Sequence, residues 1–231
     1  MNNHLLLFGS SGQIGIEIKE KFTEQGYEVH CVKRNSEQIS SKHDILWNFV
    51  ESEEINLNYD TRFNAVCFAH GININDSIYD FDENQVQNLF KVNCLSIVFS
   101  LNKLIKLNLL ENNCKICLIS SVWQNIARQN KLSYCISKSA LIGLVNSLAI
   151  DLARDGHLIN AILPGALDTE MTNKNLSNQQ LNNLKSQTIF NKLPDIEDVA
   201  NLAYFLCSDK NTSITGQFIN VDLGFSNAKI I

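Results

Sequence analysis

Short apolar runs alternate along the chain with longer segments in which apolar residues recur every three or four positions. The short runs are typical of buried strands, and the longer period is typical of amphipathic helices. Their alternation predicts a parallel sheet flanked by helices. The predicted strands are 4–8, 28–32, 45–47, 64–69, 115–119, 158–163 and 217–222. The predicted helices follow Ile14, Ile18 and Phe22; Val86, Leu89, Phe90, Ile97, Val98, Leu101, Leu104 and Ile105; residues 140–152; and Val199, Leu202, Ala203 and Leu206.

These elements predict one α/β domain over residues 1–231, with a doubly wound seven-stranded parallel sheet and helices on both faces. The length suits one domain with a substantial core. No internal repeat, low-complexity tract or linker divides the chain. In such a sheet, ligands bind at the carboxyl ends of the strands near the switch point. The motifs described next fall at those ends.

Charge and hydropathy exclude several classes of partner. The 24 acidic and 19 basic residues give a net charge of −5, which offers no footprint for nucleic acid or an anionic membrane. The longest apolar runs, such as residues 4–8, are too short to span a bilayer. The N-terminal MNNHLLLFGS has no basic region, so it is read as a first strand and not as a signal peptide. We expect a cytoplasmic protein with no nucleic-acid or membrane partner.

Seven cysteines are scattered along the chain, and their odd number argues against a disulfide framework. Cys114 and Cys117 match the C-x-x-C pattern, but no second pair or histidine cluster in the sequence completes a metal site. They are interpreted as small buried side chains, and no metal is expected.

A glycine-rich turn, GSSGQIG at 9–15, follows the first predicted strand and opens the first predicted helix. Glycines in this place allow a tight turn and let backbone N–H groups approach a pyrophosphate at the helix N-terminus. The turn predicts dinucleotide binding, and the alternative is an ordinary glycine-rich connection. The predicted contacts are Gly9, Ser10, Ser11, Gln13, Ile14 and Gly15.

The second predicted strand indicates which dinucleotide binds. An NAD site usually has a carboxylate at this strand tip for the ribose hydroxyls. Here the strand ends in Lys33 and Arg34, without an acid. Two cations suit a 2′-phosphate, so NADP(H) is favoured over NAD(H), although basic residues are common on any surface.

Tyr134 and Lys138 lie four residues apart in YCISK, so a helix would place them on one face. A phenol has an ordinary pKa of about 10, and a neighbouring ammonium is expected to lower the pKa of Tyr134 towards the working range of a general acid. The pair alone could be a coincidence.

Three polar residues strengthen the case for chemistry. Ser120 and Ser121 end the predicted strand KICLI, where a hydroxyl could donate to a substrate carbonyl. Asn93 interrupts the apolar stripe of its helix, and a buried amide is costly unless it is hydrogen-bonded. It either locks neighbouring backbone or serves a polar relay.

Together these residues resemble the short-chain dehydrogenase/reductase family, in particular its shorter branch of 3-oxoacyl-carrier-protein reductase-like enzymes. The resemblance covers nearly the whole chain. The motifs in order are the glycine turn, KVNCLSI at 91–97, ISS at 119–121, YCISKSAL at 134–141, INAILPGALDTEM at 159–171 and ITGQFINVDLGFS at 214–226. The serine-to-tyrosine interval, 134 − 121 = 13, selects Ser121 over Ser120.

The resemblance implies a Rossmann-fold oxidoreductase with the tetrad Asn93, Ser121, Tyr134 and Lys138. Tyr134 would exchange a proton with the substrate oxygen, and Ser121 would hold that oxygen. Lys138 would bind the nicotinamide ribose and lower the tyrosine pKa, and Asn93 would position a relay water. Further cofactor contacts are implied at Asn48, Ala69, Gly71, Pro164, Gly165, Leu167 and Thr169.

Four departures from the family pattern qualify cofactor details but leave the tetrad intact. Gly12 gives a spacing more typical of the longer sugar-nucleotide branch. His70 replaces a supporting residue in FAHG and either faces the cofactor or, as we favour, serves packing and hydrogen bonding. The segment from Trp47 to Asp60 is short for a crossover helix, with Trp47-Asn48 in place of an acidic adenine contact. Leu223 replaces a glycine near the C-terminus.

The sequence therefore predicts an NADP(H)-dependent enzyme that interconverts a ketone and a secondary alcohol on a small or carrier-bound substrate. Residues 172–192 are expected to form a substrate lid. The family resemblance implies a homotetramer or homodimer through the helices over 84–107 and 134–154. The alternatives are a sugar- or sugar-nucleotide-modifying reductase or epimerase-like enzyme, and a non-catalytic dinucleotide sensor.

Overall fold

A computed structural model of the chain describes residues 3–51, 61–169, 172 and 177–228. In this part of the chain, seven parallel strands form one sheet in the order β3-β2-β1-β4-β5-β6-β7. The strands are β1 (His4–Phe8), β2 (Glu28–Lys33), β3 (Ile45–Leu46), β4 (Phe63–Phe68), β5 (Leu110–Ile119), β6 (Leu158–Pro164) and β7 (Phe218–Val221). The order reverses between β1 and β4, so their carboxyl ends mark the switch point. The predicted Rossmann sheet is confirmed.

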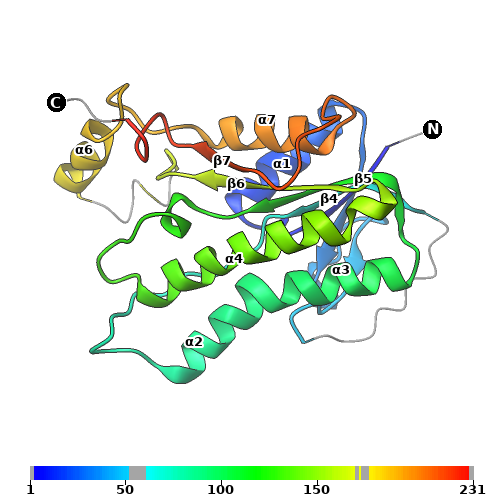
Figure 1. Cartoon of the computed structure of the whole chain (residues 1–231), viewed down its shortest axis with the longest axis horizontal. Coiled ribbons are helices and arrows are strands. Elements are labelled where there is room, and N and C mark those ends of the chain that lie inside the picture. Colours follow the sequence, from blue (N-terminus) through cyan, green and yellow to red (C-terminus); the bar gives the residue numbers. More distant parts are fainter. Residues whose placement is uncertain (1–2, 52–60, 170–171, 173–176, 229–231) are drawn as a thin grey trace.

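Helices cover both faces of the sheet (Figure 1). They are α1 (Gln13–Glu24), α2 (Glu83–Phe90), α3 (Ser96–Lys106), α4 (Leu132–Asp151), α6 (Asn178–Ser186) and α7 (Ile196–Cys207). Alternate residues of each strand point to opposite faces and build two apolar cores. One core joins the sheet to α3 and α4, and the other joins it to α1 and α7.

The predicted helix over 84–107 is built from α2 and α3, joined by a π-helical turn over Lys91–Leu95. Such turns occur mostly as single insertions and frequently at functional sites, because they displace the side chains of an otherwise regular helix. Asn93 lies in the middle of this turn and is only 2% exposed. The turn thus brings a polar side chain into the core beneath the carboxyl ends of the strands.

Several boundaries differ from the sequence prediction. Strand β5 begins at Leu110 instead of residue 115, and its pairing with β4 shifts register between Phe63 and Ala65. The polar residues at the start of β5 concealed it from an argument based on apolar runs. The predicted lid over 172–192 contains α6, but residues 173–176 lie outside the described part of the chain. The same holds for residues 52–60 of the short crossover, so both expectations remain predictions.

An aromatic cluster supports the sheet at the switch point. Phe8 stacks on Phe68 with ring centroids 4.6 Å apart, and its edges meet Phe49 at 5.0 Å and Trp47 at 5.5 Å. All four rings are buried. Aromatic pairs in these arrangements add about 0.5–1.5 kcal/mol each beyond the burial of their area. The packed rings stabilise the points where the loops after β1, β3 and β4 begin.

Cys114 and Cys117 are both buried free thiols on opposite faces of β5, because three residues separate them along a strand. Their side chains belong to different cores, which agrees with the packing interpretation of this C-x-x-C pair.

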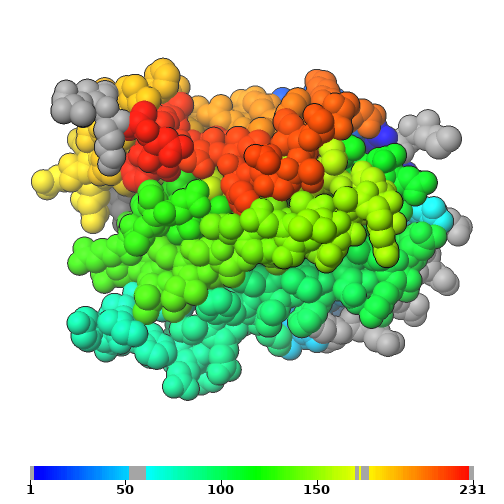
Figure 2. Space-filling model, in the orientation of Figure 1, coloured from blue at the N-terminus to red at the C-terminus, as the bar shows by residue number. Residues whose placement is uncertain are grey.

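Helix α4 has an apolar surface that the fold leaves uncovered. Among the described helices it alone is long and apolar enough by composition to cross a membrane, a test that core helices also pass. Its inner side packs on the sheet through residues such as Leu141 and Val145. Figure 2 shows α4 lying beside α2 and α3 across one face of the molecule. The exposed apolar residues of this α3–α4 face are Val98, Phe99, Ile105, Ile136 and Ile150.

Candidate active site

The glycine turn after β1 is shaped by close backbone contacts. Gly9 has a φ of +81°, and a Cβ there would collide with the backbone of Ala69 and His70 after β4. A Cβ on Gly15 would collide with the carbonyl of Gly9. Gly12 has ordinary room for a side chain, so its unusual spacing does not follow from crowding. The turn opens α1 at Gln13 and leaves a backbone cradle at a helix N-terminus, a ready site for a phosphate.

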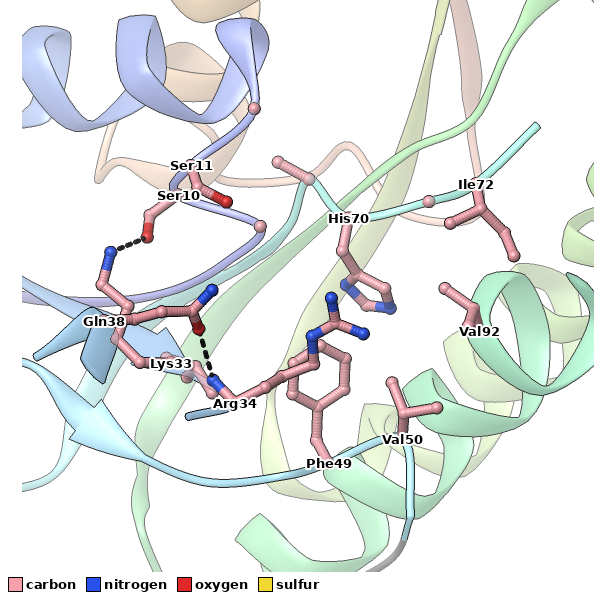
Figure 3. Close-up of a pocket in the computed structure, with 15 residues that line it drawn as sticks. Ser10, Ser11, Lys33, Arg34, Gln38, Phe49, Val50, His70, Ile72 and Val92 are labelled. Carbon is pink, nitrogen blue, oxygen red and sulfur yellow. Dashed lines mark hydrogen bonds between the residues drawn. The ribbon is translucent and has the colours of Figure 1, made fainter. Parts of the chain in front are cut away.

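Two cations border this cradle, as predicted. Lys33 ends β2 and donates from its Nζ to Ser10 Oγ over 3.0 Å. Arg34 follows, and its backbone N–H donates to Gln38 Oε1 over 3.1 Å. Figure 3 shows the Arg34 side chain reaching across Phe49 towards His70. Lys33 is half-buried and Arg34 is exposed, and both line one cleft, where their positive charge would suit a 2′-phosphate.

The cleft extends from the glycine turn to the start of α3. It is lined by Gly9, Ser10, Ser11, Gly12, Val32, Lys33, Arg34, Gln38, Phe49, Val50, Ala69, His70, Gly71, Ile72 and Val92. Phe49 and Val50 form the wall where Asn48 was expected, and Asn48 is half-buried beside them. Their apolar surfaces and the flanking cations suit a base ring next to a charged phosphate. Sequence reasoning missed Gln38, Phe49 and Val50, because nothing in their local pattern marks them as cleft residues.

His70 holds the junction between this cleft and the next. Its Nε2 lies 2.9 Å from Ser96 Oγ, which donates its own proton to the Val92 carbonyl over 2.7 Å. The hydroxyl must therefore accept from Nε2–H, which leaves a lone pair on Nδ1. Nδ1 is buried without a hydrogen-bond partner among the described residues. Burial, aided by the charges of Lys138 and Arg34, lowers the pKa of His70 to about 3, so the ring is neutral.

The structure brings packing and cleft lining together at His70. Its ring meets Phe49 at a centroid distance of 4.8 Å and Phe68 at 5.9 Å. The expected packing and hydrogen-bonding role is therefore observed, and the same side chain also lines the cleft. The two interpretations left open by the sequence are not exclusive.

A second cleft continues from His70 towards α4. Its lining residues are Ile14, Ala69, His70, Gly71, Ile72, Asn73, Ile119, Ser120, Tyr134 and Lys138. The strip from Ala69 to Ile72 belongs to both clefts, so they meet along the loop after β4. This continuity places a predicted nucleotide site and a predicted reactive tyrosine in one elongated depression.

Asn93 locks the backbone of that shared loop. Its Oδ1 accepts from Ile72 N–H at 2.9 Å, and its Nδ2 donates to the Ile72 carbonyl at 3.0 Å and to Ser137 Oγ at 3.1 Å. Ser137 in turn donates to the Tyr134 carbonyl over 2.9 Å. The amide thus ties the loop to the helix of the tyrosine. Of the two readings open at Asn93, backbone locking is the one observed, and the relay stays a proposal.

The two serines at the end of β5 have different surroundings. Ser120 donates to Gln124 Oε1 over 2.6 Å, which occupies its hydroxyl proton. Ser121 caps the following 3-10 turn by accepting from Trp123 N–H at 3.3 Å, and it shares a hydrogen bond with Tyr134. Since an acceptor role at the cap leaves the Ser121 proton available, the geometry agrees with the choice of Ser121.

Tyr134 and Lys138 lie on the same side of α4, as their spacing predicts. The Lys138 Nζ is 5.7 Å from the centre of the Tyr134 ring and donates to the Ile119 carbonyl over 3.1 Å. A Cβ added to Gly71 would stand 3.3 Å from Asn93 Oδ1 and 3.5 Å from Lys138 Nζ. The four residues of the predicted tetrad therefore converge from the π-turn, β5 and α4.

Burial opposes the effect on the tyrosine that is expected from Lys138. Burial raises the pKa of Tyr134, and the hydrogen bond with Ser121 acts in the opposite direction. Lys138 Nζ donates a hydrogen bond to the Ile119 carbonyl, and burial lowers the pKa of Lys138 to about 8. Sequence spacing showed that the two groups share a helix face, but burial, which depends on the whole fold, decides the direction of both shifts.

The remaining predicted contacts follow β6. Pro164 ends that strand, and Gly165 donates its N–H to the Val221 carbonyl over 2.9 Å. A Cβ on Gly165 would stand 2.9 Å from Asp222 Cβ, so this glycine permits the close approach of two loops. Leu167 is buried in the core, and the Thr169 hydroxyl donates to Thr172 Oγ1 over 3.0 Å. These residues lie at the carboxyl edge of the sheet, and their contact with a cofactor stays a prediction.

Some supporting residues escaped the sequence argument. Buried Asp76 accepts from Ser133 N–H at 3.1 Å and so caps the start of α4, one residue before Tyr134. Ser137 and Ser96 connect the tetrad and His70 to the backbone, as described above. These roles depend on loops that meet only in the folded chain, and serine or aspartate is too common to mark them.

A known family model matches most of the chain. Residues 39–226 match the model described as enoyl-(acyl carrier protein) reductase. The chain belongs to the short-chain dehydrogenase/reductase family.

Individual proteins are similar to this chain over nearly its whole length. The 3-oxoacyl-[acyl-carrier-protein] reductase FabG of Buchnera aphidicola is 31% identical over 96% of this chain and 87% of its own length. The L-rhamnose 1-dehydrogenase (NADP(+)) of Thermoplasma acidophilum is 29% identical, over 96% and 85%. The gluconate 5-dehydrogenase of Burkholderia cenocepacia, solved with NADP and tartrate, superposes with a TM-score of 0.88 at 20% identity, covering 99% and 97% of the two chains. That last likeness shows the shared fold.

Proposed function

We propose that this oxidoreductase uses NADP(H) to interconvert a ketone and a secondary alcohol, with Tyr134 as the general acid and base. The observation that carries the proposal is the meeting of Tyr134 and Lys138 at the far end of the cleft that begins at the glycine turn, with Ser121 sharing a hydrogen bond with Tyr134. A proton donor and a nucleotide cradle are thereby joined in one depression. Relatives that act on carbonyl or hydroxyl groups support it.

In this mechanism, NADPH supplies the hydride when it is bound. Tyr134 donates its phenolic proton to the carbonyl oxygen during reduction, and its raised pKa keeps that proton in place at neutral pH. Ser121 donates a second hydrogen bond to the same oxygen, where negative charge develops. Lys138 holds ribose hydroxyls and favours the phenolate that forms. Asn93, through the Ile72 carbonyl that it fixes, positions a water that returns a proton to Tyr134.

The preference for NADP(H) rests on the two cations at the end of β2. Lys33 lies against the glycine turn, and Arg34 crosses the cleft beside it. The rhamnose and gluconate dehydrogenases named above carry NADP in their names or titles, which supports the same choice.

Two substrate classes fit the relatives. Acyl groups on a carrier protein are named for the Buchnera relative, and sugars for the Thermoplasma relative. Neither the residues before α6 nor those within it form a basic cluster for a phosphate or a long apolar stripe for an acyl chain, within the part that the structure describes. A small polyol or sugar ketone is therefore the second candidate, while a non-catalytic sensor would not need Ser121 and Tyr134 together.

We further propose a cytoplasmic homo-oligomer. The α3–α4 face carries exposed apolar side chains and a groove between its helices, lined by Val98, Ile105 and Leu148 among others. An exposed apolar surface of this kind suits a second copy of the chain.

Replacement of the phenol tests the mechanism directly. Tyr134→Phe removes the hydroxyl and keeps the ring, so NADPH affinity should stay within about threefold while ketone reduction falls by at least about 10³-fold. Fluorescence titration of NADPH and loss of its absorbance with a panel of ketones and sugars measure the two quantities. Full activity in the phenylalanine variant would refute the proposed role of Tyr134.

A further inference from the structure

Three side chains that could hold a metal ion, His4, Glu28 and His30, converge at the amino ends of β1 and β2, at the opposite end of these strands from the cofactor cleft, and His43 lies beside them. His4 is the first residue of β1 and pairs in register with Glu28, the first residue of β2. His30 lies two residues further along β2 and therefore points to the same face of the sheet. His43 comes from the loop before β3 and reaches the same carboxylate.

Their ligand atoms lie at short mutual distances. Glu28 Oε1 is 2.8 Å from His43 Nδ1, 3.4 Å from His30 Nε2 and 4.0 Å from His4 Nδ1. His4 Nδ1 and His30 Nε2 are 3.2 Å apart. Four atoms around a tetrahedral ion with bonds of about 2.0–2.1 Å stand about 3.3 Å from one another. The three distances among His4, Glu28 and His30 lie within an ångström of this edge length, whereas His43 contacts the group through Glu28 Oε1.

The side chains around the cluster hold two of these imidazoles in place. The His30 ring is buried between Phe63 and His43, at centroid distances of 5.3 and 5.4 Å. The backbone N–H of His4 donates to Asn64 Oδ1 over 2.8 Å and fixes the start of β1. Preorganised ligands of this kind lower the cost of binding a metal.

A hydrogen-bonded cluster without a metal explains the arrangement less well. His30 Nε2 faces both Glu28 Oε1 at 3.4 Å and His4 Nδ1 at 3.2 Å, and one ring nitrogen cannot donate to the carboxylate and accept from His4 at the same time. A divalent cation would bind the lone pairs of His4, Glu28 and His30 at once. Two imidazoles and one carboxylate match zinc and its first-row neighbours, whereas magnesium and calcium prefer oxygen ligands.

We propose that His4, Glu28 and His30 bind one first-row transition-metal ion, of which Zn²⁺ is the best match, and that His43 holds the Glu28 carboxylate from outside. The ion would join β1 and β2, and His43 would connect the site to the loop before β3. That loop leads through Trp47 to Phe49 and Val50 of the cofactor cleft. Because the site lies away from the tetrad, its role is structural, and the inference stands independently of the proposed reaction.

The test uses the full chain without a histidine tag, stripped with a chelator. Isothermal titration with ZnCl₂ should give one equivalent, and CoCl₂ should give the intense visible absorption of tetrahedral Co²⁺. ZnCl₂ should raise the melting temperature, and MgCl₂ should not. Glu28→Gln removes a proposed ligand and His43→Ala removes the partner of that carboxylate, so each should weaken Zn²⁺ binding at least tenfold, the scale of a lost outer-shell partner.

Matched variants separate this site from others. Cys135→Ser removes the cysteine whose thiol is half-buried, whereas the other six are buried, and it should leave Zn²⁺ binding unchanged. His43 lies in a loop, so His43→Ala should fold even where a substitution of buried His30 does not. The proposal is overturned if the native chain binds no Zn²⁺ at one equivalent, if Glu28→Gln and His43→Ala bind it normally, or if Cys135→Ser abolishes binding.

Discussion

At the residue scale, the proposed preference for NADP(H) depends on the charge of the two cations after β2. A hydrogen bond to a charged group contributes about 1.5–3 kcal/mol, so losing both cations should weaken NADPH binding by about 10²-fold or more. Lys33→Ala/Arg34→Ala is therefore expected to bind NADPH poorly and NADH as the native protein does. Fluorescence titrations of both cofactors measure the ratio.

Lys42→Ala is the matched control for this charge change, because Lys42 is an exposed cation in the loop before β3. It should leave both affinities unchanged. An equal loss of NADPH and NADH affinity in the double variant would contradict a specific role of Lys33 and Arg34 at the 2′-phosphate.

Lys138 is expected to lower stability at neutral pH. Burial lowers its pKa in the fold to about 8 from an ordinary value of 10.5, so the unfolded chain binds more protons between these two pH values. The contribution of this group to the free energy of unfolding therefore rises with pH across that window. Below pH 8 both states carry the charge, and the buried ammonium destabilises the fold by an amount on the order of 3 kcal/mol.

The variant Lys138→Met should accordingly be more stable than the native protein at pH 7, and the difference should shrink towards pH 10. Urea denaturation of both proteins from pH 7 to 10 measures it. A difference that stays constant with pH would show that Lys138 does not titrate in this window. The same variant should lose activity, a common trade between stability and function.

At the element scale, the π-turn between α2 and α3 carries the Asn93 amide, which is hydrogen-bonded to the backbone of Ile72. Asn93→Ala would leave the N–H and carbonyl of half-buried Ile72 without their partner, which costs about 1–3 kcal/mol where water does not replace that partner. We expect a loss of that size in the free energy of unfolding and a larger fractional loss in kcat, since Ile72 lines both clefts. Chemical denaturation and steady-state kinetics test the two parts separately.

Asn88→Ala provides the comparison, because Asn88 is exposed one turn earlier in α2. Both quantities should remain close to native in that variant. If Asn93→Ala were as stable and active as Asn88→Ala, the clamp on Ile72 would have no energetic role.

The strands and the reactive pair were predictable because their signals are local. A run such as residues 4–8 is apolar over a strand length, and the spacing of Tyr134 and Lys138 is a helical repeat. The start of β5 was missed because its first residues are polar. Contacts that join distant segments, such as Asn93 to Ile72 and Ser121 to Tyr134, follow from tertiary packing, which no local period reports.

The histidine cluster shows the same limit more sharply. His4, His30 and His43 are separated by long intervals that match no metal-binding spacing, so no metal was expected from the sequence. Only the parallel register that sets His4 opposite Glu28 brings the four side chains together. The register between two strands cannot be read from local patterns in a single sequence, so the cluster could not be predicted from them.

At the scale of the whole molecule, the α3–α4 face exposes large apolar side chains that a partner could cover. Ile150 is 78% exposed and Phe99 44% exposed, although both are large and apolar. Stable interfaces bury about 800 Å² on each partner around an apolar centre, and a charge placed there is costly. Two copies of the chain related by a two-fold axis would cover this face with its own equivalent.

The substitutions Phe99→Glu and Ile150→Glu should therefore each convert a native dimer or tetramer into smaller species. A carboxylate buried without a counter-charge is far more costly than the same carboxylate in water, so the assembly should dissociate while the fold persists. Light scattering after size exclusion measures the mass, and circular dichroism checks the fold. Ile39→Glu, at a 41% exposed residue in the loop after β2, should keep the native mass. If the native chain is a monomer, or if the Phe99 and Ile150 variants keep the native mass, this face is not the interface between copies.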